Sequence, residues 1–176
     1  MIVIVGESAS GKSTVEKILQ NDYGYKKIVS FTTRKPRDGE INGVDYYFVD
    51  DDEFKNLREV GFFIETATYN GWNYGTPKKQ CVDNVVLVAT PHGLRQLKKS
   101  GVDIISFYIN VPRRDRLIKI LQRGDNIEEA YRRSLSDVGQ YDGIKDEVDY
   151  VITNDVYSKT PEEIAKNIID ILKERK

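Results

Sequence analysis

Residues 6–13 read Gly6-Glu7-Ser8-Ala9-Ser10-Gly11-Lys12-Ser13 and fit the pattern G-x-x-x-x-G-K-[ST]. The apolar run Ile2–Val5 comes before this stretch, and Lys12–Asp22 has the spacing of an amphipathic helix. Between a strand and a helix, this pattern marks a phosphate-binding loop (P-loop), whose backbone N–H groups surround the phosphates of a nucleotide. The sequence therefore predicts a nucleotide site near the start of the chain.

The residues of this loop have separate expected roles. Glycines let the backbone approach the phosphates closely, and the helix N-terminus adds a partial positive charge. Lys12 is expected to reach the β- and γ-phosphates, and the Ser13 hydroxyl is expected to ligate Mg²⁺. Because the carboxylate of Glu7 would repel phosphate, we expect its side chain to point to solvent. The residues predicted to contact the nucleotide are Gly6, Ser8, Ala9, Ser10, Gly11, Lys12, Ser13 and Thr14.

Short apolar runs alternate with helical stretches, which is typical of βαβ units and a parallel sheet covered by helices. Continuous apolar runs such as Val85–Val88 indicate strands buried on both faces. We predict an α/β fold of the three-layer P-loop NTPase type. The expected central strands are Ile2–Val5, Lys27–Ser30, Val85–Ala89, Ile104–Ile109 and Tyr150–Thr153. The expected helices are Lys12–Asp22, Pro91–Ser100, Pro112–Gln122 and one that begins after Thr160.

The composition limits the classes of partner. The chain has 176 residues, which suits one domain. Its 27 Lys and Arg against 28 Asp and Glu give a net charge of −1, whereas proteins that coat nucleic acid carry a basic excess. The single Cys81 excludes an internal disulfide, and the N-terminal apolar run is too short for a signal peptide or membrane span. We expect a cytoplasmic monomer or homodimer that binds neither nucleic acid nor membrane.

Two segments interrupt the alternation of strands and helices. Residues 31–80 contain short strands, a helix expected at about Asp51–Val60 and a turn at Gly71–Gly75. Residues 124–141 are polar and charged, which suits a mobile surface lid. We therefore expect a single domain over 1–176, with a core of 1–30, 81–123 and 142–176, an insertion at 31–80 and a lid at 124–141.

The loop Ser30–Glu40 carries two arginines around a proline. Arg34 and Arg37 are three positions apart, and two guanidinium groups on a stiff loop suit the bidentate capture of a phosphate. Tyr46 follows in Gly43–Phe48, and its hydroxyl group can complete such a site. The alternative reading is a charged surface loop.

The P-loop, Ser30–Glu40, Gly43–Val49, Phe63–Ala67 and Tyr74–Thr76 occur in an order that resembles the guanylate kinase family. The resemblance covers nearly the whole chain and implies that ATP, with Mg²⁺, phosphorylates GMP or dGMP. It implies a GMP-binding role for the insertion at 31–80. The residues implied to hold the GMP phosphate are Arg34, Arg37, Tyr46 and Tyr74, and those implied to face guanine are Ser30, Glu65 and Thr76.

The chemistry of guanine supports the role of Glu65. Guanine presents N1–H and the 2-amino group as adjacent donors, and one carboxylate accepts from both. Adenine has an acceptor at N1 and no 2-amino group, so it would leave the carboxylate unpaired. A buried unpaired charge costs several kcal/mol, which is sufficient to select the base.

The lid region is rich in arginine. In the family, lid arginines close over the phosphates during transfer, and the resemblance assigns this role to Arg123. The second family arginine aligns with Ser134, so we assign its role to the neighbouring Arg133. The expected catalytic residues are therefore Lys12, Arg34, Arg123 and Arg133. We expect Arg113, Arg114 and Arg116 to form a solvated helix face.

Asn154-Asp155 matches a family pair near the ATP adenine, although this dipeptide also favours a simple turn. The family usually carries Asp-x-Asp at the end of the third core strand, and this chain has Val88-Ala89-Thr90 there. The loss can weaken metal binding, slow the reaction or change the acceptor. Two alternatives therefore stay open, a non-catalytic binding module and a kinase for another nucleoside monophosphate. We expect His92 to cap the helix that starts at Pro91 and give Trp72 no role.

Overall fold

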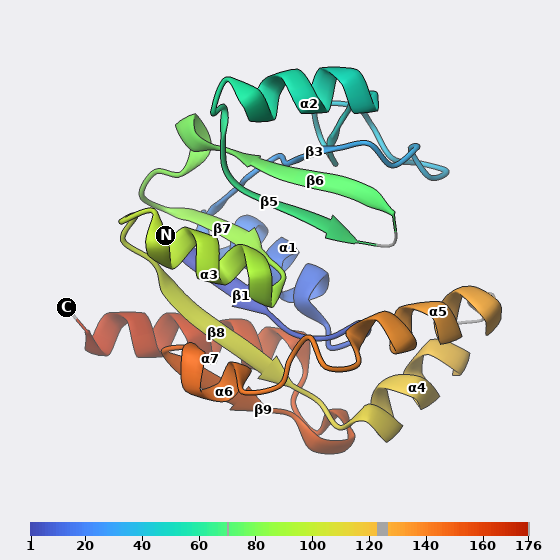
Figure 1. The fold of residues 1–176 in the computed structure, drawn as a ribbon. Coiled ribbons are helices and arrows are strands. Elements are labelled where there is room, and N and C mark those ends of the chain that lie inside the picture. Colours follow the sequence, from blue (N-terminus) through green and yellow to red (C-terminus); the bar gives the residue numbers. More distant parts are fainter. Residues whose placement is uncertain (70, 123–126, 176) are drawn as a thin grey trace.

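The computed structural model describes residues 1–69, 71–122 and 127–175 (Figure 1). Its centre is a five-stranded parallel sheet in the order β2-β7-β1-β8-β9. The strands are β1 (Ile2–Val5), β2 (Lys26–Lys27), β7 (Val85–Val88), β8 (Ile105–Asn110) and β9 (Tyr150–Thr153). All five predicted central strands contribute to this sheet, although β2 is shorter than expected and starts one residue earlier. The predicted P-loop fold class is confirmed.

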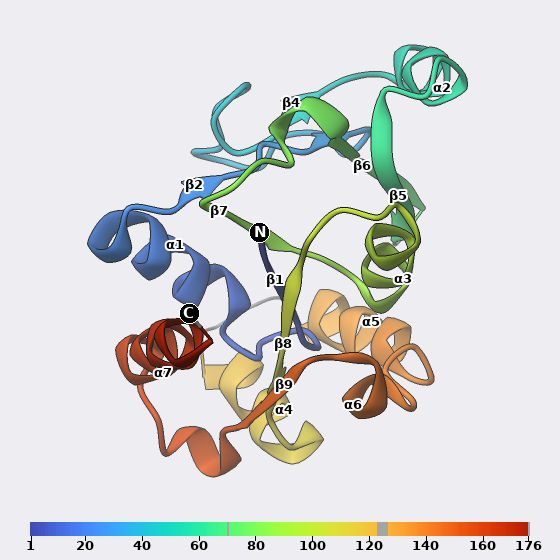
Figure 2. The same ribbon diagram turned by 90° about the vertical axis from the view of Figure 1, so that its left-hand side faces the viewer.

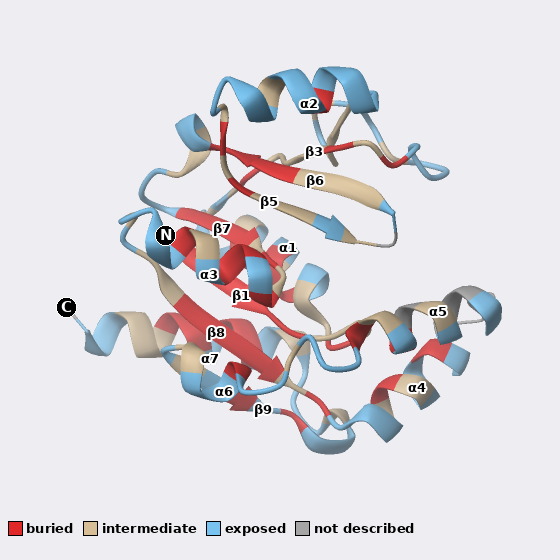
Figure 3. Cartoon of the chain, viewed as in Figure 1, coloured by how far each residue is buried: buried red, intermediate tan, exposed pale blue. Residues whose placement is uncertain are grey.

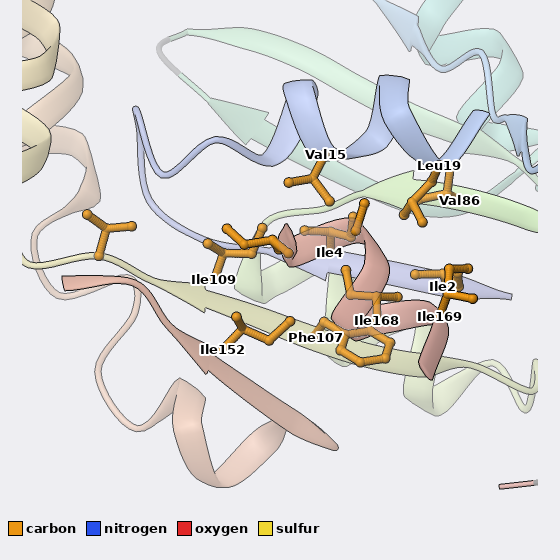
Figure 4. Close-up of a cluster of buried hydrophobic side chains, with 13 residues drawn as sticks. Ile2, Ile4, Val15, Leu19, Val86, Phe107, Ile109, Ile152, Ile168 and Ile169 are labelled. Atoms are coloured by element: carbon orange, nitrogen blue, oxygen red, sulfur yellow. The ribbon is translucent and has the colours of Figure 1, made fainter. Parts of the chain in front are cut away.

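The two faces of β1 pack against different helices. Ile2 and Ile4 join a cluster with α1 (Lys12–Tyr23) and α7 (Pro161–Glu174), which Figure 4 shows. Val3 and Val5 join a second cluster with α3 (Pro91–Lys99) and the short α6 (Ile144–Glu147). Because alternate residues of a strand point to opposite faces, a sheet covered on both sides needs continuous apolar strands. The buried residues are accordingly concentrated in the central sheet (Figure 3).

A smaller sheet lies beside the central one, with strand order β4-β3-β6-β5. Its strands are β3 (Phe31–Thr32), β4 (Tyr47–Phe48), β5 (Phe63–Tyr69) and β6 (Trp72–Pro77), and α2 (Asp51–Glu59) covers it. The predicted turn at Gly71–Gly75 is wrong, because most of that stretch lies in β6 and pairs antiparallel with β5. Gly75 sits against the Phe63 ring, where an added Cβ would come within 2.8 Å.

The remaining helices follow β8. α4 (Arg113–Gln122) and α5 (Ile127–Asp137) contact each other and extend away from the central sheet (Figure 1). Figure 2 shows α1 and α7 on one side of the central strands and α3 and α6 on the other. The 3₁₀ turns η1 (Lys78–Gln80) and η2 (Asp155–Tyr157) complete the described elements. The boundaries of the insertion at 31–80 and the lid at 124–141 stay predictions. No helix in the described ranges has both the length and the apolar character that crossing a membrane requires.

Short polar side chains cap the starts of α2, α3 and α7. At the start of α7 the Thr160 hydroxyl accepts from the Glu163 N–H, and the Glu163 carboxylate accepts from the Thr160 N–H. The Asp50 carboxylate caps α2 by accepting from the Glu53 N–H. The expectation that His92 caps α3 is wrong. The Thr90 hydroxyl accepts from the Gly93 N–H instead, because the residue before the first turn has the extended backbone that a cap requires.

Glu16 is a buried carboxyl group on α1, with 8% of its surface exposed. Burial raises its pKa to about 7, although Lys27 and Lys17 oppose the shift. Since the folded pKa lies above the unfolded value, the folded protein holds this proton more strongly. The stability that protonation contributes is complete below about pH 4.5 and is lost as the pH rises through about 7.

Glu16→Gln is therefore expected to raise the free energy of unfolding by about 2 kcal/mol at pH 8 and to change it little at pH 5. Glutamine keeps the shape of the side chain and carries no charge at either pH. Urea denaturation at both pH values measures the difference. Glu174→Gln is the control, because it removes the same charge from an exposed position. An equal effect of Glu16→Gln at both pH values would contradict the account.

Candidate active site

The P-loop connects β1 to α1 in a tightly wound conformation. Gly11 and Ala9 have φ angles of 93° and 64°, in the left-handed region. At Gly6 an added Cβ would lie 2.6 Å from the Ser10 hydroxyl oxygen and 2.9 Å from the Ile109 carbonyl oxygen, so only glycine fits. The Ser10 hydroxyl is buried without a hydrogen-bond partner among the described residues. A hydroxyl in this state fits a loop that takes up a phosphate.

Lys12 sits at the first turn of α1 with its ammonium group folded back onto the loop. Its Nζ donates to the Glu7 carbonyl oxygen at 2.7 Å. Burial lowers the pKa of Lys12 to about 8, while the negative charges of Asp137 and Glu7 oppose the shift. The charged form of a lysine held in this way is stabilised when an anionic phosphate binds beside it. The geometry thus suits the predicted contact of Lys12 with phosphates.

The prediction that the Glu7 side chain points to solvent is wrong. Its carboxylate accepts from the Tyr108 hydroxyl at 2.9 Å and lies 3.4 Å from an Arg116 guanidinium nitrogen. Arg116 is also not the solvated residue expected, since only 7% of its surface is exposed and its Nε donates to the Val111 carbonyl oxygen. The physical reason is that β8 and α4 bring a phenol and a guanidinium group under the loop, where they neutralise and bind the carboxylate.

Asp137, the last residue of α5, lies against the loop from the other side. Its carboxylate accepts from the Ser8 N–H at 2.9 Å and lies 3.5 Å from Arg116 Nη1. Asp137 was not among the site residues predicted from the sequence. Its partners lie far away along the chain, so no local pattern signals the contact.

A cavity of about 250 Å³ lies between the P-loop and the smaller sheet. It is lined by residues from both, together with Val88–Thr90 at the end of β7. The predicted site residues that line this cavity are Ser8, Lys12, Ser30, Tyr46, Glu65 and Tyr74. The structure thus brings loop residues and expected acceptor residues together around one space.

The three residues expected to face guanine form a connected chain. Glu65 on β5 lies opposite Thr76 on β6, and the Thr76 hydroxyl donates to Glu65 Oε1 at 2.5 Å. The Ser30 hydroxyl lies 3.4 Å from that of Thr76. Burial raises the pKa of Glu65, and the bond from Thr76 opposes the shift. Gly93 leaves room for the carboxylate, because an added Cβ there would lie 2.7 Å from Glu65 Oε2.

The two arginines of the loop Ser30–Glu40 differ in burial and in contacts. The Arg34 side chain is buried and binds both Glu40 carboxylate oxygens, at 2.8 and 2.9 Å. Its guanidinium carbon also lies 5.5 Å from the centre of the Tyr46 ring, which fixes it beside the cavity. Arg37 is exposed, and its backbone N–H donates to Glu40. The loop is therefore ordered by Glu40, and only Arg34 is held in place by its side chain.

A sequence model of one family, described as guanylate kinase, matches residues 1–171. The chain belongs to the guanylate kinase family. It is 36% identical over 163 residues to a guanylate kinase of Trichormus variabilis, with 88% of this chain and 82% of that protein covered. It is also 34% identical over 178 residues to a guanylate kinase of Rickettsia prowazekii, with 96% of this chain and 90% of that protein covered. The predicted family is confirmed.

The fold is also similar to a solved guanylate kinase. The crystal structure of guanylate kinase from Anaplasma phagocytophilum matches with a TM-score of 0.71 at 32% identity, covering 99% of this chain and 85% of that one. The match includes both sheets of this chain, since it extends over nearly all residues. The contacts described above therefore belong to a guanylate kinase scaffold.

Within that scaffold, the end of β7 carries no acidic side chain. Val88, Ala89 and Thr90 line the cavity at the positions for which the resemblance to the family implies Asp-x-Asp. In the part of the chain that the structure describes, no group of three His, Cys, Asp or Glu side chains is placed to hold a metal ion. Ser13, exposed at the start of α1, is the predicted metal ligand. One hydroxyl fits Mg²⁺ that arrives with ATP, because this ion usually keeps waters and phosphate oxygens as ligands.

The predicted lid arginines are not tested. Arg123 lies outside the described residues, and of Arg133 only the backbone, in α5, is described. Ser134, with which the second family arginine was expected to align, is buried. The Asn154 side chain is also buried, and both of its polar ends bind the backbone of Lys159. These bonds form the turn that was the alternative reading, and the adenine contact stays a prediction.

Proposed function

We propose that this protein transfers the terminal phosphoryl group of ATP to the phosphate of GMP or dGMP. One observation carries the proposal: Lys12 of the P-loop and Glu65 of the smaller sheet line the same cavity. A nucleoside monophosphate whose base pairs with Glu65 would point its phosphate towards the loop that holds ATP. Phosphoryl transfer then follows from holding the donor and acceptor phosphates close together, because its catalysis is mainly positioning and charge neutralisation.

In this reaction an oxygen of the acceptor phosphate attacks the γ-phosphorus, and the bond from that phosphorus to the β–γ bridging oxygen breaks. Lys12 neutralises charge on the donor phosphates. Arg34, held by Glu40, faces the acceptor phosphate together with Arg37, Tyr46 and Tyr74. Mg²⁺ bound with ATP, with Ser13 as its protein ligand, would reduce the negative charge of the phosphates. Gly6, Ser8–Gly11 and Thr14 surround the donor phosphates, and Asn154 lies at the adenine end.

The base is selected by the chain from Ser30 through Thr76 to Glu65. The Thr76 hydroxyl fixes one oxygen of Glu65, which leaves the other oxygen and the remaining lone pairs for the base. The two adjacent donors of guanine satisfy this carboxylate, and adenine would not. Because Glu65 is buried, an unsatisfied contact here has a large energetic penalty.

An ADP-release assay with Mg-ATP and a panel of acceptors tests the function. We expect turnover with GMP and dGMP and at least a hundredfold lower kcat/KM with AMP, CMP, UMP and dTMP, since none of these bases presents the two adjacent donors with which guanine satisfies Glu65. Binding of ATP and GMP without turnover would indicate a non-catalytic module. A preference for another base would indicate a different nucleoside monophosphate kinase, the reading that the changes at Val88 and Thr90 leave open.

A further inference from the structure

The helix α5 bridges the P-loop and the tip of the β5–β6 hairpin. The Ser136 hydroxyl donates to the Tyr69 hydroxyl of β5 at 2.8 Å. The Arg132 guanidinium carbon lies 5.5 Å from the centre of the Trp72 ring on β6. Asp137, at the end of the same helix, accepts from the Ser8 N–H. The position of α5 is thus linked to the loop and to the acceptor side of the cavity (Figure 1).

The surroundings of the Asp137 carboxylate are those of a bound anion. It accepts from a P-loop N–H, lies 3.5 Å from the Arg116 guanidinium group and interacts with the charge of Lys12. Only 8% of its surface is exposed, and it lines the cavity. Donors and cations surround a phosphate in a P-loop, whereas a metal ion would need further oxygen ligands. A carboxylate on a neighbouring helix occupies a phosphate-like position.

We propose that Asp137 stands in for a nucleotide phosphate in the nucleotide-free protein, and that ATP binds by displacing it. The proposed displacement depends on the proposed function in one respect only, namely that the P-loop binds ATP. Two anions cannot share the Ser8 N–H, so the carboxylate leaves as the phosphate enters. Arg116 then exchanges its contact with Asp137 for one with the phosphate. In this way Arg116 supplies a cation near the donor, where the second family arginine is replaced by Ser134.

The displacement has a thermodynamic and a structural consequence. The apparent affinity for ATP is reduced by the fraction of molecules in which Asp137 is bound to the loop. Since Asp137 belongs to α5, its release also shifts the helix that carries Arg132 over Trp72. The binding of the donor nucleotide is thereby coupled to the acceptor side of the cavity.

Isothermal titration calorimetry with ATP, without acceptor, measures the first consequence. Asp137→Asn is expected to bind ATP about tenfold more tightly than the wild type, because asparagine loses the charge-assisted bond to Ser8 and the attraction to Arg116. Asp142→Asn is the matched control. It removes the same charge from an exposed position five residues further along and is expected to leave the affinity unchanged. Equal affinity of Asp137→Asn and the wild type, or an equal gain in Asp142→Asn, would overturn the proposal.

The fluorescence of Trp72, the only tryptophan, measures the second consequence in the wild type and needs no variant. Adding ATP alone is expected to change its emission with the half-saturation found by calorimetry. Saturation with ATP at constant emission would mean that α5 stays in place, and would overturn the displacement. The acceptor assay separates the two proposals. Turnover of GMP without these ATP effects removes only the role of Asp137, and the ATP effects without turnover remove only the kinase function.

Discussion

Replacing Lys12 with glutamine (Lys12→Gln) is expected to lower kcat for GMP phosphorylation about a thousandfold and to leave the fold at least as stable. The loss of activity follows because no other described side chain of the P-loop brings a positive charge to the donor phosphates. The stability follows from the environment. Burial lowers the pKa of Lys12 to about 8, so the charged form is disfavoured in the folded protein before nucleotide binds.

Steady-state kinetics and urea denaturation at pH 7 measure the two effects together. Lys17→Gln is the control, because Lys17 is an exposed lysine on the same helix. It is expected to change neither quantity appreciably. A fall in stability of Lys12→Gln that matched its fall in activity would mean that the lysine supports the structure, and the proposed catalytic role would be lost.

Replacing Glu65 with glutamine (Glu65→Gln) is expected to lower the selectivity for GMP over AMP, taken as the ratio of their kcat/KM values, at least a hundredfold. Glutamine offers one carbonyl oxygen and an amide group, so it cannot accept from both donors of guanine. Its NH₂ group can donate to N1 of adenine, which raises the relative rate with AMP. The Thr76 hydroxyl can still donate to the carbonyl oxygen, so the local structure is kept.

The comparison needs kcat/KM for both acceptors at saturating Mg-ATP. Glu59→Gln is the matched control, because it makes the same change at an exposed position of α2. Because burial raises the pKa of Glu65, the variant is not expected to lose stability at pH 8. Unchanged selectivity with a normal fold would show that guanine is recognised by other residues.

The fold and the P-loop were predictable because their signals are local. The pattern of residues 6–13 lies between a strand and a helix as expected, and the continuous apolar strands are buried on both faces. Hydrophobic period and capping residues are properties of neighbouring positions. The prediction of a turn at Gly71–Gly75 was wrong because a contact with another strand decided the structure there. Glycine and asparagine favour turns locally, but pairing with β5 places that stretch in a strand.

The network beneath the P-loop could not be predicted in the same way. The Ser8–Asp137 bond joins residues 129 positions apart, and the Arg116–Glu7 contact joins residues 109 apart. From the sequence alone, Glu7 and Arg116 look like ordinary surface charges, because nothing nearby indicates that they meet. Arg34, Arg37 and Tyr46 were proposed from the residues of their loop as a phosphate site, whereas the residues facing guanine were identified by resemblance to a family. The structure places Ser30, Glu65 and Thr76 in one chain of side chains, and their contact with guanine stays a prediction.

The pairing of Glu65 with Thr76 has a consequence for the evolution of substrate range. These residues are only eleven positions apart and face each other across one hairpin. The donor half is assembled from segments spread over most of the polypeptide. With the proposed role of Glu65 in reading the base, mutations confined to the β5–β6 hairpin would exchange one nucleobase preference for another, while the residues around the triphosphate are inherited unchanged.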